Sequence, residues 1–386
     1  MRGPMVRPIV IAAGGTGGHL FPAEALAAEL IARGERIALM TDARSAAFES
    51  PAFANAERFV LRGAGLAGRG VKQAISGAFA LASGTLTARR LLGRLDASAV
   101  IGFGGYPSVP PLLAARMMPA ATRPATALHE QNAVLGRANR MLARGVDLLA
   151  LSVPETSRVP SGAVVELVGN PVRPALAALA GQDYAAPTPD GVVRLLVLGG
   201  SLGARVFADV VPAAVALLPE GLRGRLVVTQ QTRAEDLPRV ETAYREAGVP
   251  AELSPFFGDM ATRLSLAHLV IARAGASTVA ELGCAGRPAI LVPLPSAIDD
   301  HQTGNARASD VSGAAWLMAQ PAFTAEALAK HLTAILGNPP VLVRAAAAAA
   351  KLARPDAARR LADLVQSLVA RSDAPRIARS AVPELR

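Results

Sequence analysis

Pro8-Ile9-Val10-Ile11-Ala12-Ala13-Gly14-Gly15-Thr16-Gly17-Gly18-His19 is a short apolar run that leads directly into a glycine-rich loop. The apolar residues predict a buried strand, and the pattern after the loop predicts a helix over 19–33 and a second strand over 36–41. A strand, a loop, a helix and a strand in this order are typical of a βαβ unit. The chain therefore begins with the first unit of a parallel sheet.

A second unit of the same kind begins near the middle of the chain. Residues 192–198 predict a strand, Gly199-Gly200-Ser201-Leu202-Gly203 a loop, and 204–218 a helix. Between the two units, 169–191 is rich in Pro, Gly and Ala, which indicates a linker, and we place the boundary near Arg173. At 386 residues the chain is longer than one core usually supports. We therefore expect two α/β domains, each with a Rossmann-like parallel sheet.

The apolar runs of the chain are all short. The run over 9–13 meets Gly14 too early to be a signal-peptide core, and every longer candidate is interrupted before about 18 residues. We expect a cytoplasmic protein without a membrane-spanning helix. The single cysteine, Cys284, excludes an internal disulfide and a cysteine metal cluster.

The formal net charge is +10, and positive charge is concentrated between Arg58 and Leu95, where no acidic residue occurs. Apolar and basic residues recur there at roughly helical spacing, namely Val71, Ile75, Phe79 and Leu86 beside Lys72, Arg89 and Arg90. An apolar stripe flanked by cations suits a helix on an anionic membrane. Packing of the stripe on a sheet explains the same spacing. Nucleic acid is not an expected partner, because only 4% of the residues are aromatic and can stack on bases.

Two glycine loops are expected at one edge of the first sheet. Gly14–His19 lies between a strand and a helix, where backbone N–H groups can bind a phosphate. Leu20 occupies the third glycine position of the dinucleotide fingerprint, which disfavours a nicotinamide enzyme. Gly102-Phe103-Gly104-Gly105-Tyr106 follows a strand predicted over 97–101, and parallel strands bring both loops to the same edge. The pair favours a diphosphate site, whereas one such loop alone is equally compatible with a tight turn.

The most specific pattern lies in the second half. A strand over 269–273 precedes a helix that starts at Ala276-Ser277-Thr278 and offers N–H groups to a nucleotide diphosphate. Glu281, on the first turns of that helix, can accept both hydroxyl hydrogens of a ribose. Gln302 and Asn305 lie three apart on one predicted helix face and present amide groups suited to sugar hydroxyls. Each residue alone is compatible with a solvated surface, but the ordered combination favours a nucleotide-sugar site.

The ordered motifs of the chain are Gly14–His19, Gly102–Tyr106, His129-Glu130-Gln131-Asn132, Gly169-Asn170-Pro171-Val172-Arg173, Gly199-Gly200-Ser201 and Ala276–Asn305. Over about residues 5–370 they resemble the MurG family of UDP-N-acetylglucosamine transferases. The resemblance implies the GT-B glycosyltransferase fold, two Rossmann-like domains with parallel sheets that face a cleft. It also implies an inverting enzyme of peptidoglycan synthesis that moves N-acetylglucosamine from its UDP carrier to the C4 hydroxyl of lipid I, giving lipid II.

The resemblance also sets the expected domain bounds. The first domain, over 1–172, binds the acceptor and the membrane and is completed by a C-terminal helix over 355–371. The second domain, over 173–354, binds UDP-N-acetylglucosamine. We expect residues 372–386 to be disordered. The expected partners are the nucleotide sugar, lipid I and an anionic membrane, with the protein peripheral on the cytoplasmic face.

The expected roles of individual residues follow from the resemblance and from the helix pattern described above. The UDP-N-acetylglucosamine site is assigned to Thr16, Gly17, Gly18, Asn132, Arg173, Ser201, Phe257, Ala276, Ser277, Thr278, Glu281, Gln302 and Asn305. The acceptor diphosphate is assigned to Gly14, Gly15, Gly104, Gly105 and Tyr106. Two positions depart from the family pattern. Phe257 replaces a smaller aliphatic residue, and Ala67 replaces a basic residue whose role Arg62 and Arg69 can take over.

Inverting transfer needs a base for the acceptor hydroxyl and stabilisation of the UDP leaving group. His19 is our first candidate base, because it begins a helix at the loop and imidazole titrates near neutrality. Glu130 is the alternative, and binding of the acceptor diphosphate is the other role open to His19. The sequence has no Asp-x-Asp pair to hold a metal, so we expect no metal or cofactor. We assign the stabilisation of charge on the leaving group to Arg173 and to backbone N–H groups. A transferase for another lipid acceptor and a UDP-sugar epimerase stay as alternatives.

Overall fold

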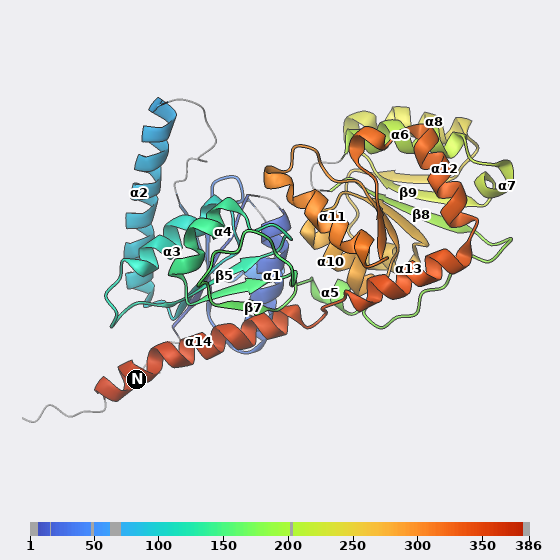
Figure 1. Ribbon diagram of the computed structural model, residues 1–386. Coiled ribbons are helices and arrows are strands. Elements are labelled where there is room, and N and C mark those ends of the chain that lie inside the picture. Colours follow the sequence, from blue (N-terminus) through green and yellow to red (C-terminus); the bar gives the residue numbers. More distant parts are fainter. Residues whose placement is uncertain (1–6, 16, 48–49, 62–70, 201–203, 381–386) are drawn as a thin grey trace, which may run out of the picture. The chain divides into compact units, whose positions relative to one another are not determined.

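The chain folds into two compact units, each with its own central sheet between layers of helices (Figure 1). The computed structural model describes residues 7–15, 17–47, 50–61, 71–200 and 204–380. The first domain comprises 1–173 with 356–386, and the second domain comprises 174–355.

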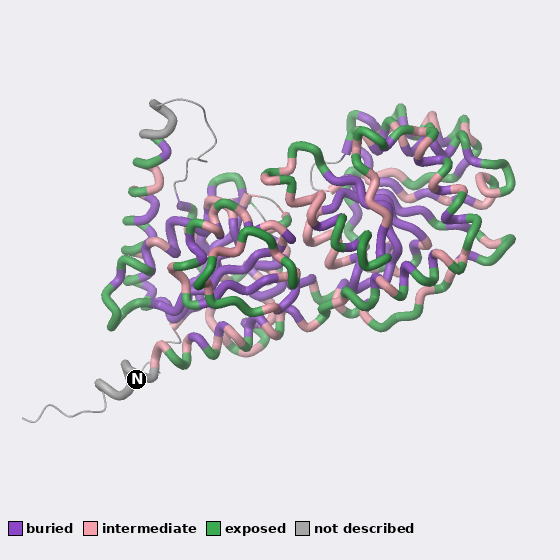
Figure 2. The backbone as a smooth tube through the Cα atoms, viewed as in Figure 1, coloured by how far each residue is buried: buried purple, intermediate pink, exposed green. Residues whose placement is uncertain are grey.

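Within the described residues, the sheet of the first domain has seven strands in the order β3-β2-β1-β4-β5-β6-β7, and all neighbours run parallel. The strands are β1 (Ile9–Ala12), β2 (Ile37–Thr41), β3 (Glu57–Val60), β4 (Ala99–Gly102), β5 (Ala125–Glu130), β6 (Leu148–Leu151) and β7 (Val165–Leu167). The central strands β1 and β4 are buried along their whole length (Figure 2), because helices cover both faces, and their sequences are therefore continuously apolar. The strand order reverses between them, which places their carboxyl ends at the switch point where α/β proteins bind ligands.

The helices of the first domain form two cores, one on each face of the sheet. Its helices are α1 (Gly17–Ala32), α2 (Val71–Leu95), α3 (Val109–Arg116), α4 (Arg137–Leu142) and α14 (Ala357–Ser380), with short 3-10 turns at Pro51–Phe53, Tyr106–Ser108 and Ala143–Gly145. Leu26 of α1 and Val365 of α14 belong to one core. Leu92 of α2 and Leu112 of α3 belong to the other.

The second domain repeats this plan with a sheet that, among the described residues, has six parallel strands in the order β10-β9-β8-β11-β12-β13. The strands are β8 (Val193–Leu198), β9 (Leu226–Gln231), β10 (Ala251–Ser254), β11 (Leu269–Ala272), β12 (Ala289–Leu291) and β13 (Ala315–Leu317). Its switch point lies between β8 and β11. The two parallel-sheet domains confirm the predicted fold class.

Helices cover both faces of the second sheet as well. They are α5 (Pro174–Ala177), α6 (Arg205–Ala216), α7 (Glu220–Arg223), α8 (Leu237–Glu246), α9 (Met260–Leu266), α10 (Ala276–Ala285), α11 (His301–Val311), α12 (Ala325–Leu336) and α13 (Pro339–Lys351), with 3-10 turns at Ala234–Asp236, Ile298–Asp300 and Gln320–Ala322. In the described part of the chain, no single helix is long and apolar enough to cross a membrane. Helices α12 and α13, bent by 91°, meet that test as a pair by length and composition alone.

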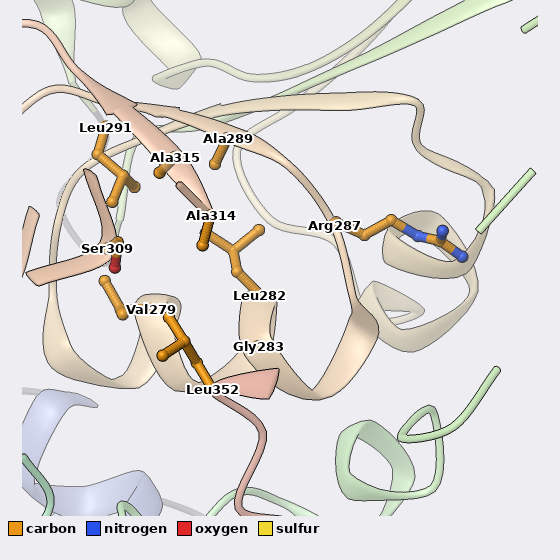
Figure 3. Close-up of a pocket in the computed structure, with 10 residues that line it drawn as sticks. All are labelled: Val279, Leu282, Gly283, Arg287, Ala289, Leu291, Ser309, Ala314, Ala315 and Leu352. Atoms are coloured by element: carbon orange, nitrogen blue, oxygen red, sulfur yellow. The ribbon is translucent and has the colours of Figure 1, made fainter. Parts of the chain in front are cut away.

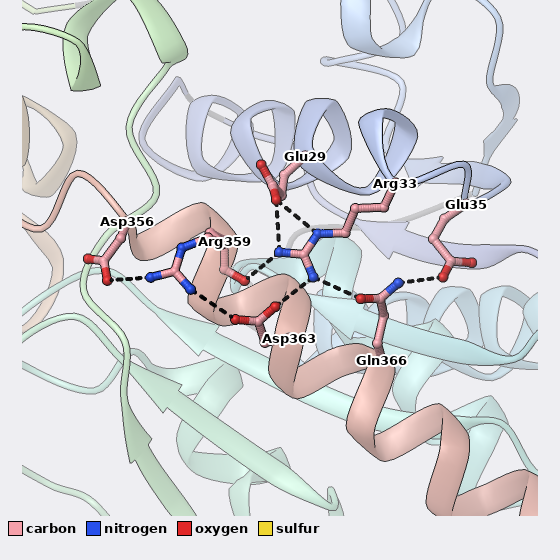
Figure 4. A network of polar contacts seen from close by, with 7 residues as sticks. All are labelled: Glu29, Arg33, Glu35, Asp356, Arg359, Asp363 and Gln366. Atoms are coloured by element: carbon pink, nitrogen blue, oxygen red, sulfur yellow. Dashed lines mark hydrogen bonds and ion pairs between the residues drawn. The ribbon is translucent and has the colours of Figure 1, made fainter.

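The C-terminal helix α14 is fastened to α1 by a polar network (Figure 4). Arg33 of α1 donates to Asp363 at 2.6 Å and to Gln366 at 2.8 Å, and it also pairs with Glu29 of its own helix at 2.8 Å. A second contact, the ion pair between Arg7 and Asp373, holds α14 closer to its C-terminal end.

The expectation of a disordered tail from residue 372 is wrong for residues 372–380, because α14 continues to Ser380. The pairing of Asp373 with Arg7 is the physical reason, since it ties this part of the helix to the first domain. Residues 381–386 lie outside the described part of the chain.

Replacing Arg33 with methionine should lower the free energy of opening of α14 by about 1–2 kcal/mol, because a network is lost while the apolar stem is kept. Hydrogen exchange of the α14 amides measures this quantity. The matched control is Arg359→Met. The side chain of Arg359 is 58% exposed, against 21% for Arg33, so this variant should lower the same free energy by less than about 0.5 kcal/mol. Equal effects from the two variants would contradict the assignment.

Candidate active site

The two glycine loops of the first domain lie at the carboxyl ends of neighbouring strands, as predicted. The loop at Gly14 follows β1 and the loop at Gly104 follows β4, and β1 pairs with β4. The hydroxyl of Ser108 joins them, donating to the carbonyl oxygens of Ala12 at 3.1 Å and Gly104 at 2.9 Å. A Cβ at Gly14 would lie 2.9 Å from the hydroxyl oxygen of Thr41, so only glycine fits this turn.

His19, in the first turn of α1, packs against the second glycine loop. A Cβ at Gly104 would lie 3.3 Å from the ring carbon Cε1 of His19, and one at Gly105 would lie 3.5 Å from Nε2. Both glycines have positive φ, 88° and 68°, which a side chain would strain. Among the described residues the Tyr106 hydroxyl is buried without a hydrogen-bond partner, and burial raises its pKa. The structure thus brings the candidate base and the candidate acceptor loop together.

Glu130 does not fit the role of alternative base. It is 2% exposed at the end of β5, and each carboxylate oxygen accepts two hydrogen bonds. Oε1 accepts from the backbone N–H and the side-chain amide of Asn132, both at 3.0 Å. Oε2 accepts from Gly136 N at 2.8 Å and Asn139 Nδ2 at 2.9 Å. A carboxylate offers about four acceptor positions, so Glu130 has none left for a substrate proton and instead organises the loop after β5.

His129 and Gln131, which the sequence indicated only as parts of a motif, form a buried chain of hydrogen bonds to His19. Gln131 Oε1 lies 3.1 Å from His19 Nδ1, and Gln131 Nε2 lies 3.0 Å from His129 Nδ1. His129 Nε2 lies 3.0 Å from the carbonyl oxygen of Gly169. Burial lowers the pKa of His129 to about 4, so its imidazole is neutral near pH 7.

Arg173 lies at the end of the first domain with its guanidinium 4.7 Å from the ring centre of Phe21 in α1. That ring in turn covers the loop, because a Cβ at Gly17 would lie 2.9 Å from it. Gly17 is half-buried and Gly18 is exposed. Thr16 and, in the second domain, Ser201 were also predicted for the donor, and both lie outside the described residues.

The start of α10 is the strongest candidate anion site of the second domain. Gly275 caps it without a side-chain hydrogen bond, and the first N–H bonded within the helix is that of Val279, to Gly275 O. The first-turn N–H groups are therefore available to an anion. Within the described residues, the Ser277 hydroxyl is buried without a partner. Glu281 is half-buried one turn later, on the same face.

The opposite side of α10 packs into the interior and leaves a cavity of only about 10 Å³ (Figure 3). Most of its lining residues are apolar, with Val279, Leu282, Leu291 and Leu352 among the larger side chains, and Arg287 and Ser309 are its polar members. It has room for about one water molecule, so it is not a substrate site. The packing around it holds α10 in place.

Gln302 and Asn305 were both predicted to contact sugar hydroxyls, and both lie on α11, but the structure places their side chains differently. Gln302 is half-buried, and its Oε1 accepts from Leu294 N at 2.9 Å. Asn305 is 3% exposed, and its Nδ2 donates to the carbonyl oxygen of Ala274 at 3.0 Å. The expectation that Asn305 contacts sugar hydroxyls is therefore not met, because its side chain is buried beneath the turn that precedes α10 and holds that turn.

Two features of this edge were not predicted. Arg273, 9% exposed at the end of β11, donates to the carbonyl oxygens of Val292 and Pro293, both at 3.1 Å, and joins the loops after β11 and β12. Asp299 and Asp300 both have φ of 54°, a conformation that non-glycine residues rarely adopt. Strained residues of this kind gather at functional sites.

Phe257 is 7% exposed, and the guanidinium of Arg263 lies 4.1 Å from its ring centre. Its side chain is therefore used in packing, which leaves the backbone to contact a ligand. The adjacent Phe256 is 73% exposed.

Comparison with known proteins identifies the family. Residues 9–150 match the glycosyltransferase family 28 N-terminal domain, and residues 194–361 match the family 28 C-terminal domain. A relative from Granulibacter bethesdensis is 58% identical over 369 residues, covering 96% of both chains. A relative from Rhodospirillum centenum is 56% identical over 360 residues, covering 93% of both chains. Both are named UDP-N-acetylglucosamine–N-acetylmuramyl-(pentapeptide) pyrophosphoryl-undecaprenol N-acetylglucosamine transferase.

Solved structures agree with the sequences. The crystal structure of MurG from Acinetobacter baumannii matches with a TM-score of 0.76 and 30% identity, covering 94% of this chain and 99% of the other. A UDP-N-acetylglucosamine 2-epimerase from Listeria monocytogenes matches with a TM-score of 0.63 but only 12% identity, over 93% and 95% of the two chains, which shows the fold alone. The chain belongs to glycosyltransferase family 28 and, within it, to the MurG family of N-acetylglucosamine transferases.

Proposed function

We propose that this glycosyltransferase moves N-acetylglucosamine from UDP-N-acetylglucosamine to the C4 hydroxyl of lipid I, MurNAc-pentapeptide-diphosphoryl-undecaprenol. The products are lipid II and UDP, in peptidoglycan synthesis. The observation that carries the proposal is 58% identity over 96% of the chain to a relative named for this transfer. The fold alone does not select the reaction, because a 2-epimerase shares it.

In the proposed mechanism, His19 takes the proton of the C4 hydroxyl while that oxygen attacks C1 of the donor sugar. The bond between C1 and the diphosphate oxygen breaks, UDP leaves with the electron pair, and the configuration at C1 inverts. The packing of His19 on Gly104 and Gly105, which we assign with Gly14, Gly15 and Tyr106 to the acceptor diphosphate, supports this role.

Donor binding is proposed for the α10 edge of the second domain. The first-turn N–H groups with Ser277 and Thr278 bind the diphosphate, and Glu281 binds the ribose. Gln302 contributes its amide nitrogen. Arg173, aligned by Phe21, stabilises charge on the departing UDP. Thr16, Gly17, Gly18, Asn132, Ser201 and the Phe257 backbone complete the proposed donor site.

Incubation of the protein with radiolabelled UDP-N-acetylglucosamine and lipid I tests the function directly. Label should enter the lipid fraction as the disaccharide product, and only when lipid I is present. Faster labelling of a different polyprenyl acceptor would overturn the acceptor assignment. Conversion of the nucleotide sugar without any acceptor would favour an epimerase.

We also propose that helix α2 docks the enzyme on the cytoplasmic face of the membrane. The buried side of α2 includes Leu92 and Leu95, whereas Phe79 and Leu86 on its other side are 76% and 48% exposed. Met117, at the end of the neighbouring α3, is 52% exposed. These exposures support the membrane alternative over packing on the sheet. The predicted stripe also included Val71, Lys72 and Ile75, whose side chains lie outside the described part of the structure. The same holds for Arg62, Ala67 and Arg69.

Binding to vesicles rich in acidic lipid should fall as salt rises, because charge attraction is screened over about 10 Å at 0.1 M salt. Phe79→Glu should weaken binding several-fold further, because an apolar contact becomes a charge repelled by the leaflet. Co-sedimentation measures both effects. The matched control is Leu217→Glu, at a 55% exposed position of the second domain, which should leave binding unchanged. Binding that is independent of salt and of Phe79 would contradict the proposal.

A further inference from the structure

The buried side chain of Gln131 has one amide orientation compatible with its neighbours. Its Nε2 lies 3.0 Å from the carbonyl oxygen of Phe103 and 3.2 Å from that of His129. A flipped amide would place its oxygen against these two carbonyl oxygens, with no hydrogen between them. The nitrogen therefore faces the carbonyls, and the amide oxygen faces His19.

This orientation determines which nitrogen of His19 carries a hydrogen. The amide oxygen of Gln131 can only accept, so the hydrogen in the 3.1 Å contact belongs to His19 Nδ1. In a neutral imidazole the other nitrogen then has the lone pair. Both ring nitrogens lie beside the acceptor loop, since Nε2 is 3.5 Å from a Cβ built at Gly105 and Nδ1 is 3.5 Å from one built at Gly104. Nδ1 is engaged by Gln131, so Nε2 is the nitrogen whose lone pair can accept a proton.

His129 holds Gln131 in turn. Its Nε2 lies 3.0 Å from the carbonyl oxygen of Gly169, so Nε2 carries the hydrogen and Nδ1 accepts from Gln131 at 3.0 Å. Protonation of His129 would place an N–H against the amide nitrogen of Gln131 and turn the amide. His129 is 0% exposed, and the resulting low pKa keeps it neutral.

We propose that Gln131 and His129 are positioning residues that hold the proton of His19 on Nδ1 and so leave Nε2 as the base for the acceptor hydroxyl. The inference rests on the proposed role of His19 and extends it, because it names the reacting atom and the two residues that select it. Without the amide oxygen of Gln131, an imidazole prefers its proton on Nε2, which then has no lone pair to accept the proton of the acceptor hydroxyl.

Nitrogen NMR of the full-length protein with ¹⁵N-labelled histidine tests this assignment, since the chain has only five histidines. His19→Gln identifies the His19 signals by their loss. In the wild type, Nδ1 of His19 should have the shift of a protonated nitrogen and Nε2 that of an unprotonated one. Gln131→Met, similar in length but without the acceptor, should reverse the two. It should also lower kcat about 10- to 100-fold and leave the donor KM within about twofold.

Asn139→Leu is the matched control in the same loop. Asn139 Nδ2 donates to His129 O at 3.2 Å and to Glu130 Oε2 at 2.9 Å, so the variant loses two hydrogen bonds and keeps the contact between Gln131 and His19. It should leave the His19 tautomer unchanged.

An unprotonated Nδ1 in the wild type overturns the proposal whether or not any variant folds, as does a reversed tautomer in Asn139→Leu. Reversal in Gln131→Met with unchanged kcat overturns the role of His19 as base and leaves the hydrogen-bond assignment intact. The two failures are thus distinguishable.

Discussion

Glu281→Ala should raise the dissociation constant for UDP-N-acetylglucosamine about 30- to 1000-fold, equivalent to about 2–4 kcal/mol. The loss is large because a carboxylate that accepts from two ribose hydroxyls makes two charge-assisted hydrogen bonds. Glu281 lies one turn beyond Ser277, whose buried hydroxyl has no partner among the described residues. Side chains four apart share a helix face, so ribose and diphosphate can be bound side by side. Calorimetric titration with the nucleotide sugar measures the change.

Two further variants make this test specific. Glu281→Gln keeps the shape and one acceptor oxygen but removes the charge, so its loss of affinity should be intermediate. Glu241→Ala removes an exposed carboxylate on α8 and should leave the affinity unchanged. A dissociation constant for Glu281→Ala within twofold of the wild type would exclude the ribose assignment.

The repeated strand, loop and helix units could be predicted from the sequence because the signals that specify them are local. The apolar run at Ile9–Ala12 is buried on both faces and therefore lacks polar residues, and the glycines after it mark the turn. The same holds for β11 and α10 in the second domain. The glycines were correctly placed at the sheet edges because parallel strands all end on the same side.

Burial of polar residues could not be predicted, and this explains the differences at Asn305 and Glu130. Asn305 lies three residues after Gln302 on α11, but the next residue, Ala306, is fully buried, so Asn305 faces the interior. Glu130 ends strand β5 at the edge of the site, which is a position that suits a catalytic base. Its four donors come from the loop that follows, and a sequence pattern does not reveal the shape of such a loop.

The contributions of Gln131 and Arg273 were missed for a related reason. Their partners are backbone carbonyl oxygens on other strands and loops, at Phe103 for Gln131 and at Val292 and Pro293 for Arg273. Every residue has the same backbone carbonyl group, so residue identity carries no signal for such a contact. The chain of hydrogen bonds that reaches His19 became visible only once the fold had brought β4 and β5 together.

His19→Gln should lower kcat about 10²- to 10⁴-fold, the usual contribution of a general base, and leave the affinity for UDP-N-acetylglucosamine within about threefold. Glutamine is similar in size and can still bond to Gln131, but it has no basic nitrogen. Glu130 is not expected to take over, because its acceptor positions are filled. Steady-state kinetics with lipid I and calorimetry with the donor separate the two quantities.

The pattern of the kinetic change decides between the two roles open to His19. Loss of a base lowers kcat and kcat/KM together, because the interaction exists only in the transition state. Loss of a ligand for the acceptor diphosphate raises the KM for lipid I and leaves kcat close to the wild type. His331→Gln, at a half-buried histidine of the second domain that packs edge-on against Trp316, is the control and should change neither. A raised KM with unchanged kcat would assign His19 to the diphosphate, and the reacting base would then have to come from elsewhere in the complex.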